Sequence, residues 1–284
     1  MKTAEQLKGA IRNIAKDKNV RSQEVLQMFL FERILDRLAA SSYKNNFILK
    51  GGLLISSTIG ISERTTMDMD TTVRGIDMAE DKIERIVKEV LSIDAEDGIH
   101  FTYKRIEPIR EDDDYNNFRV YMDAEYGKIK NPMKIDITTG DEITPAAVRY
   151  DYPLLFEERS IPVMAYTLET ILAEKYETVI RRNIGTTRAR DFYDLYALFH
   201  VRKEQIRVSI LKDAVEHTAR KRGSLELLFE WKEIIQDIRE EKALQKLWTN
   251  YVEENFYASK LTFEEVVDVV SEIGKIINDE ERES

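Results

Sequence analysis

The stretch that decides the fold is Phe47-Ile48-Leu49-Lys50-Gly51-Gly52. Three apolar residues precede the glycines and three more, Leu53 to Ile55, follow them, so the pattern predicts a short strand that turns directly into a helix. The amide groups at the start of a helix suit phosphate, and glycine lets a phosphate approach the backbone without a Cβ in the way. We therefore expect Gly51 and Gly52 to bind the phosphates of a nucleotide.

A pair of acids, Asp68 and Asp70, follows in Asp68-Met69-Asp70. Residues two apart on a strand point to the same face, so both carboxylates are expected to project together beside the glycine turn. Two oxygen ligands together with substrate phosphates are what Mg²⁺ prefers. We predict that these two acids share Mg²⁺, with Mn²⁺ as an alternative.

A third acid, Asp136, lies between two isoleucines in the alternating segment from Pro132 to Gly140. A lone buried carboxylate in a central strand would cost several kcal/mol. That cost is offset if Asp136 meets Asp68 and Asp70 around a metal. In two-metal sites for phosphoryl transfer, a third carboxylate can also activate the attacking hydroxyl.

The order Gly-Gly, D-x-D and a later single Asp resembles the nucleotidyltransferases of the DNA polymerase β type. Three further matches make the resemblance narrower: R-x-T-x-D-x-D from Arg64 to Asp70, I-D-x-x-x-G from Ile135 to Gly140, and a lysine followed by R-D-x-x-D from Lys175 to Asp194. Four such pieces in this order are similar to the AbiEii/AbiGii toxin family. Gly52 departs from the pattern, because many nucleotidyltransferases have Ser there.

The resemblance implies a toxin of a toxin–antitoxin pair that transfers a nucleotide, with a cognate antitoxin as a possible partner. It also implies roles in the C-terminal half. Lys175 is expected to neutralise a triphosphate oxygen as charge develops on the leaving group. Asp191 is expected to orient Lys175 or Arg190, or to bind base or sugar, whereas Asp194 is expected to pair with Arg190 on its own helix. Arg64 is a further candidate for phosphate binding.

Composition bounds the class of protein. The chain has 284 residues, enough for a large core and two domains, and contains no cysteine, which excludes disulfides and thiolate metal sites. No apolar run approaches the ~20 residues of a membrane helix, and the start lacks the apolar core of a signal peptide. We expect a cytoplasmic protein with no membrane partner.

The net charge of −10 hides an asymmetry. Between Lys175 and Arg222 there are twelve Lys or Arg residues against six Asp or Glu residues, which gives this segment a charge of +6. A basic helical region beside acidic metal ligands could hold RNA or a triphosphate. The alternative is a set of helices with ordinary solvated charges, and the acidic remainder could dock a basic antitoxin.

Hydrophobic periodicity divides the chain into two parts. We predict a nucleotidyltransferase domain at 1–155, an α/β fold with a mixed sheet and two N-terminal helices, and an all-helical domain at 156–284 that closes the nucleotide cleft. The predicted elements are helices at 3–17, 22–40 and 77–93, strands at 99–106, 117–126 and 133–139, and, after a helix from Thr167, helices near 204–221, 224–256 and 262–278. The acids at 111–114 are expected in an exposed loop, and 279–284 is expected to fray.

The predicted reaction is the transfer of a nucleoside monophosphate from an NTP to an acceptor hydroxyl with release of pyrophosphate, an activity of the EC 2.7.7 type. The expected acceptor is the 3′ end of a tRNA, or another RNA. Two alternatives stay open at this point: nucleotidyl modification of a protein target, and a non-catalytic module that binds NTP for partner contact. The predicted catalytic residues are Asp68, Asp70, Asp136, Lys175 and Asp191.

Overall fold

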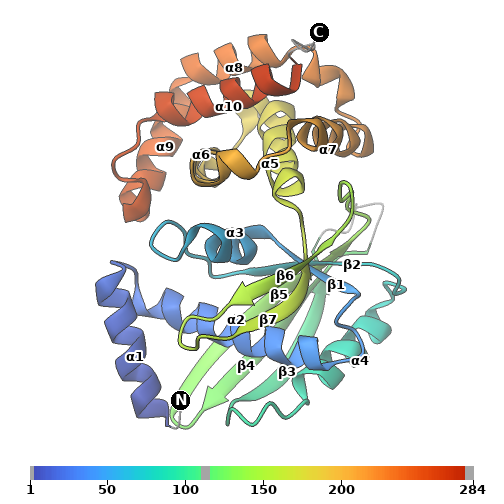
Figure 1. Cartoon of the computed structure of the whole chain (residues 1–284), viewed down its shortest axis with the longest axis vertical. Helices are drawn as coiled ribbons and strands as arrows, with labels where there is room; N and C mark the ends of the chain where they lie inside the picture. Colours follow the sequence, from blue (N-terminus) through green and yellow to red (C-terminus); the bar gives the residue numbers. More distant parts are fainter. Residues whose placement is uncertain (1–2, 110–115, 279–284) are drawn as a thin grey trace. The chain divides into compact units, whose positions relative to one another are not determined.

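A computed structural model describes residues 3–109 and 116–278 of the chain (Figure 1). The predictions for 111–114 and 279–284 lie outside these described residues. The chain divides into two compact units, one made of 1–141 and 147–166, the other of 142–146 and 167–284. Each unit has its own core and is described by itself.

The first unit is built on a seven-stranded mixed sheet with the strand order β3-β4-β5-β2-β1-β7-β6. Strands β2 and β5 are parallel, as are β1 and β7, and the remaining neighbours are antiparallel. The elements of this unit are α1 (Ala4–Asp17), α2 (Ser22–Ala40), β1 (Phe47–Lys50), α3 (Gly51–Ile59), β2 (Met69–Val73), α4 (Glu80–Leu91), β3 (His100–Pro108), β4 (Phe118–Tyr126), β5 (Ile129–Thr139), β6 (Val148–Pro153) and β7 (Ser160–Ala165).

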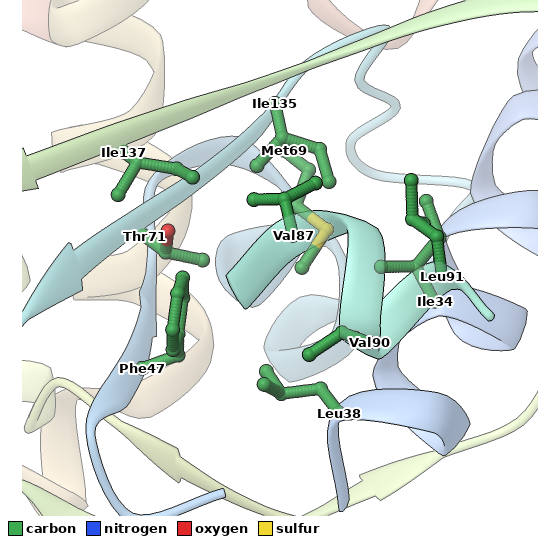
Figure 2. Close-up of a pocket in the computed structure, with 10 residues that line it drawn as sticks. All are labelled: Ile34, Leu38, Phe47, Met69, Thr71, Val87, Val90, Leu91, Ile135 and Ile137. Atoms are coloured by element: carbon green, nitrogen blue, oxygen red, sulfur yellow. The ribbon is translucent and has the colours of Figure 1, made fainter. Parts of the chain in front are cut away.

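One face of this sheet is covered by α2 and α4, and the core of the unit lies between these helices and the sheet (Figures 1 and 2). Alternate residues of β2 and β5, such as Met69 and Ile135, point into this core, where they meet Leu38 of α2 and Val87 of α4. Because side chains alternate along a strand, Asp70 and Asp136 project from the opposite face. The alternation that the sequence predicted therefore separates an apolar face from a charged one.

A small cavity remains in this core and is shown in Figure 2. It measures about 30 Å³, and apart from the hydroxyl of Thr71 its lining is apolar. Ligand pockets are roughly ten times larger, of the order of 300–1,000 Å³. The cavity is thus a packing defect between α2, α4 and the sheet.

The strands predicted from the sequence end at residue 139, but the sheet contains two more strands further along the chain. Residues 148–153 and 160–165 form the antiparallel strands β6 and β7, and β7 extends the sheet through parallel pairing with β1. Pro153 and Pro162 lie within these strands, where β6 is the edge of the sheet. Prolines weaken the strand pattern, and pairing with a strand a hundred residues away leaves no local signal.

The second unit is helical among its described residues, as predicted. The predicted helix at 224–256 is wrong, because α8 ends at Glu240 and α9 begins at Lys242, with Glu241 accepting a hydrogen bond from the Ala243 backbone. The α-helices are α5 (Leu168–Arg182), α6 (Ala189–Arg202), α7 (Val208–Lys221), α8 (Trp231–Glu240), α9 (Lys242–Glu254) and α10 (Phe263–Asn278).

None of the helices in the described ranges combines the length and the hydropathy needed to cross a bilayer.

Candidate active site

The glycine turn has the predicted form: β1 ends at Lys50 and α3 begins at Gly51. Gly51 has φ +66°, a conformation that side chains with a Cβ rarely adopt. A Cβ at this position would also overlap the carboxylate of Asp70. Glycine is therefore required twice, for the backbone conformation and for the close approach of Asp70 to the start of α3.

Gly52 is closely packed on its other side. A Cβ at this position would lie 2.7 Å from Oγ1 of Thr66 and 3.2 Å from Nη2 of Arg64. The Thr66 hydroxyl also accepts a hydrogen bond from the Asp68 backbone at 3.2 Å, so it links the glycine turn to the D-x-D motif. In this chain a serine at position 52 would displace Thr66, which explains the departure from the Ser found in many nucleotidyltransferases.

Arg64 was predicted to bind phosphate directly, but its side chain lies in the interior and is 2% exposed. Its guanidinium group donates to the Thr65 carbonyl and lies behind Gly52. In this structure Arg64 supports the backbone of the glycine turn. Its role in nucleotide binding stays a prediction from the sequence.

Four charged residues lie side by side across four neighbouring strands. Lys50 of β1 is opposite Asp70 of β2, Asp70 is opposite Asp136 of β5, and Asp136 is opposite Arg119 of β4. Directly opposite residues project from the same face of a sheet. We call this set the charged row; it contains two acids in the centre and a cation at each end.

Arg119 binds Asp136 through two parallel hydrogen bonds, from Nε to Oδ1 at 2.7 Å and from Nη2 to Oδ2 at 2.8 Å. This bidentate geometry is the strongest form of an arginine–carboxylate pair. The pKa of the Arg119 guanidinium is raised by the hydrogen bonds that it donates to Asp136. Two residues before Asp136 on β5, Lys134 lies 3.0 Å from the Asp68 carboxylate.

At the other end of the charged row, Lys50 lies 2.5 Å from the carboxylate of Asp141, which also accepts a hydrogen bond from Thr138. Burial alone would raise the pKa of Asp141, but the charge and hydrogen bond of Lys50 outweigh burial and lower it to about 2. Lys50 is thus held beside Asp70 as a cation by a permanently ionised partner.

The predicted metal donors are carboxylate oxygens, which fit Mg²⁺ or Mn²⁺ by their chemistry. Asp70 and Asp136 are neighbours in the sheet, and Asp68 is two residues from Asp70. In residues 3–109 and 116–278, however, no three acidic or histidine side chains already converge as a metal site. Asp68 and Asp136 face Lys134 and Arg119 instead. The donor set fits a divalent metal, which would have to compete with these cations.

In the helical unit, Lys175 of α5 lies between two acids of α6, 2.9 Å from Asp191 and 2.7 Å from Asp194. Arg188 makes a second bond to Asp191 at 2.5 Å. Burial would lower the pKa of Lys175, but the two aspartates outweigh it and the pKa is raised. Burial would raise the pKa of Asp191, which Lys175 and Arg188 lower. The structure thus places Asp191 where it orients Lys175.

The predicted pair between Arg190 and Asp194 was wrong: no ion pair joins them in the described ranges, and Asp194 contacts Lys175. Helix spacing allowed the local pair, but the side chain of Asp194 is fully buried. A buried carboxylate needs a buried cation, and Lys175 is the cation within reach. This partner comes from another helix, so spacing along α6 could not reveal it.

The basic segment from Lys175 to Arg222 is largely neutralised within its own unit. Carboxylates outside the segment, including Glu169, Glu174 and Glu272, take part in this neutralisation. Ion pairs to acids of this unit are formed by Lys175, Arg181, Arg188, Lys203, Arg207, Arg220 and Arg222. The excess of +6 counted along the sequence therefore overstates the positive charge that this unit offers to a ligand.

Sequence reasoning did not select Lys50, Arg119, Lys134 or Asp141 as site residues. Lys50 and Lys134 lay within the segments that identified their neighbours, and Lys134 alternates in phase with Asp136 along β5. Arg119 was hidden in an alternating strand in which charged residues are expected on the open face. Lys50 and Arg119 are members of the charged row, Lys134 contacts Asp68, and Asp141 contacts Lys50; these neighbours come together once the strands are in register.

Comparison with known proteins identifies the family of this chain. Residues 33–269 match the family described as "Nucleotidyl transferase AbiEii toxin, Type IV TA system". The match covers most of the chain, and the protein belongs to this family. Its membership makes it a nucleotidyltransferase of the toxin–antitoxin class, a class whose toxins have a cognate antitoxin.

Two solved structures share the fold. A candidate nucleotidyltransferase from H. pylori is 17% identical, with a TM-score of 0.51 over 91% of this chain and 97% of that one. JHP933 from Helicobacter pylori is 16% identical, with a TM-score of 0.51 over 90% of this chain and 94% of that one. No match was found among curated protein sequences. At these identities the two structures support the fold.

Proposed function

We propose that this protein transfers a nucleoside monophosphate from an NTP to an acceptor hydroxyl, with release of pyrophosphate, and that the acceptor is the 3′ end of a tRNA. The observation that carries the proposal is the position of Asp70. Its carboxylate lies against Gly51 at the start of α3 and beside Asp136 across the sheet. The glycine turn, whose amides would bind phosphate, and two acids thereby lie together on the face of the sheet opposite the apolar core.

The first unit supplies the groups that bind the triphosphate. The free amides at the start of α3 would bind phosphate oxygens, and Lys50 beside Asp70 would add a fixed positive charge. Arg64 and Thr66 would keep the turn at Gly52 in place. When bound by Asp68, Asp70 and Asp136, Mg²⁺ or Mn²⁺ would neutralise charge on the reacting phosphates. Asp136 would accept the proton of the acceptor hydroxyl.

For Lys175 and Asp191 we keep the roles predicted from the sequence, neutralisation of a triphosphate oxygen by Lys175 and its orientation by Asp191. The ion pair between them supports the orienting role of Asp191. A cytoplasmic protein with RNA as its partner is part of the same proposal. The tRNA acceptor rests on the family resemblance, since the basic segment from Lys175 to Arg222 is largely paired internally.

The test is incubation of the purified protein with Mg²⁺, each α-³²P-labelled NTP in turn and total RNA, followed by separate resolution of RNA and protein. We expect label on a tRNA-sized band. Asp70→Asn should reduce this label by a factor on the order of a hundred or more, because it removes a charge from the reacting centre. Asp151→Asn, in an exposed acid on β6 of the same unit, is the matched control and should leave the label unchanged.

The other outcomes distinguish the alternatives. Label on protein in place of RNA would support modification of a protein target. NTP binding without pyrophosphate release from any acceptor would support a non-catalytic module. Full transfer activity in a folded Asp70→Asn protein would show that the charged row is not the reacting centre.

A further inference from the structure

Two acids of the predicted metal-binding set each form an ion pair with a cation: Asp136 with Arg119, and Asp68 with Lys134. The two pairs differ in geometry. Arg119 uses two nitrogen atoms to occupy both oxygens of Asp136 at 2.7 and 2.8 Å. Lys134 makes a single contact with Asp68 at 3.0 Å. The Arg119 pair also joins residues that are directly opposite in β4 and β5, so the strands themselves hold the two groups together.

This geometry sets a condition on metal binding. A carboxylate has about four lone-pair positions, and the bidentate guanidinium group of Arg119 uses one on each oxygen of Asp136. A divalent cation that takes either of these positions would replace one of the two Arg119 bonds. The Asp136 side chain is 18% exposed and that of Arg119 is 34% exposed, so the pair lies at the open face, where such an exchange is sterically possible.

We propose that the divalent metal takes the place of Arg119 on Asp136, and that the released guanidinium group then binds a phosphate of the incoming nucleotide. Guanidinium groups bind carboxylate and phosphate oxygens with the same planar two-donor geometry. This inference rests on the proposed function.

The proposal predicts effects of opposite sign in two measurements on Arg119→Gln. Without its competitor, Mn²⁺ should bind the nucleotide-free protein about fivefold more tightly, which corresponds to about 1 kcal/mol, the upper range for a partly exposed ion pair. Without a guanidinium group for the phosphate, the KM for NTP should rise severalfold. A purely structural role for Arg119 would not tighten Mn²⁺ binding.

The first measurement is the Kd for Mn²⁺, obtained from the electron paramagnetic resonance signal of free Mn²⁺ at constant ionic strength. Lys130→Gln is the matched control, because Lys130 lies on β5, the strand of Asp136, and pairs with exposed Glu125 at 2.9 Å. It should leave both Kd and KM unchanged. In Arg119→Gln/Asp136→Asn the gain in Mn²⁺ affinity should disappear, since the carboxylate for which metal and arginine compete is gone.

Two results would overturn the inference in different ways. Mn²⁺ binding that depends on Asp70 but is equal in the parent protein and Arg119→Gln would remove the exchange and leave the proposed function standing. In the second result, Asp70→Asn does not weaken Mn²⁺ binding in either the parent protein or Arg119→Gln. The metal site and the exchange would then both be refuted. Near-ultraviolet circular dichroism of each variant confirms that the fold is retained.

Discussion

At the residue scale, the absence of a Cβ at Gly51 lets the carboxylate of Asp70 approach the start of α3. The Gly51 backbone has φ +66° and its Cα faces the carboxylate of Asp70. We expect Gly51→Ala to lower the free energy of unfolding by roughly 1–3 kcal/mol, because the left-handed conformation and the overlap with Asp70 both oppose a methyl group. Urea denaturation followed by circular dichroism measures this change.

Gly9 provides the control for this substitution. It is an exposed helical residue of α1, and a Cβ there would meet nothing within 4 Å. Gly9→Ala should therefore stabilise the protein by roughly 0.5–1 kcal/mol, the usual gain inside a helix. A Gly51→Ala protein as stable as the parent would contradict the tight approach of Asp70 to the turn.

A second residue, Glu32 of α2, makes stability depend on pH. Its side chain is fully buried, and burial raises its pKa to about 8, against 4.5 in the unfolded chain, despite a hydrogen bond from the Leu155 backbone and the charge of Arg33. Glu157 and Asp36 also face it and raise the pKa further. Between pH 4.5 and about 8 the folded protein holds a proton that the unfolded chain has lost. The free energy of unfolding must therefore fall as pH rises through this window.

Glu32→Gln removes this proton without removing the acceptor for Leu155. We expect the variant to gain stability relative to the parent as pH rises from 5 to 8, by an amount on the order of a few kcal/mol. Glu24→Gln should change the pH dependence only below about pH 4.5, where the parent loses the stabilisation of its carboxylate, because hydrogen bonds from Arg21 and Thr65 outweigh burial and lower the pKa of Glu24. Thermal unfolding at several pH values checks both, and an unchanged pH dependence in Glu32→Gln would refute the assignment.

At the element scale, α5 and α6 are joined by Lys175, which bridges Asp191 and Asp194 at 2.9 and 2.7 Å. Lys175→Met would leave two buried carboxylates with one cation fewer. We expect a loss of about 3–5 kcal/mol in the free energy of unfolding, as is typical when one partner of a buried ion pair is removed. Chemical denaturation of the variant gives this quantity.

The companion variant tests whether the loss is electrostatic. In Lys175→Met/Asp194→Asn the number of buried charges is balanced again, so part of the stability should return. Activity measured in the same variants then separates catalysis from folding. A stable but inactive Lys175→Met protein would assign Lys175 to the transfer reaction alone.

At the scale of the whole molecule, the distribution of charge limits how the protein can hold RNA. The chain has a net charge of −10, and seven cations of the basic segment are paired with acids of the same unit. Each phosphate that a protein neutralises adds about 0.9 to the slope of log K against log salt for duplex DNA and about 0.7 for single strands. We expect a shallow slope, below about 3, for binding of unstructured RNA.

Fluorescence anisotropy of a labelled single-stranded RNA between 50 and 200 mM KCl, a range over which tight phosphate binders lose ~10³-fold or more in affinity, measures this slope. An exposed pair such as Arg220–Glu216 provides a check, since Glu216→Gln frees a cation and should steepen the slope slightly. A steep slope in the parent protein would show that the ion pairs of α5 to α7 open when RNA binds.

The sequence by itself determined the strand that turns into a helix at Gly51, the alternation that places Asp70 and Asp136 opposite the apolar face, and the helical nature of the second unit. These features follow from periods of two and 3.6 residues and from the special conformation of glycine, which are properties of neighbouring residues. The four motifs in order also led to the family that the comparison confirmed.

The tertiary structure alone decided which cation each acid meets. The register of β4 and β5 places Arg119 opposite Asp136, and the register of β1 and β2 places Lys50 opposite Asp70. Within the described residues, Asp194 pairs with Lys175 of α5 and not with Arg190 of its own helix. Strands β6 and β7 likewise exist because β7 pairs with distant β1. Pairing across the sheet and between helices depends on residues far apart in the chain, and a local pattern carries no information about them.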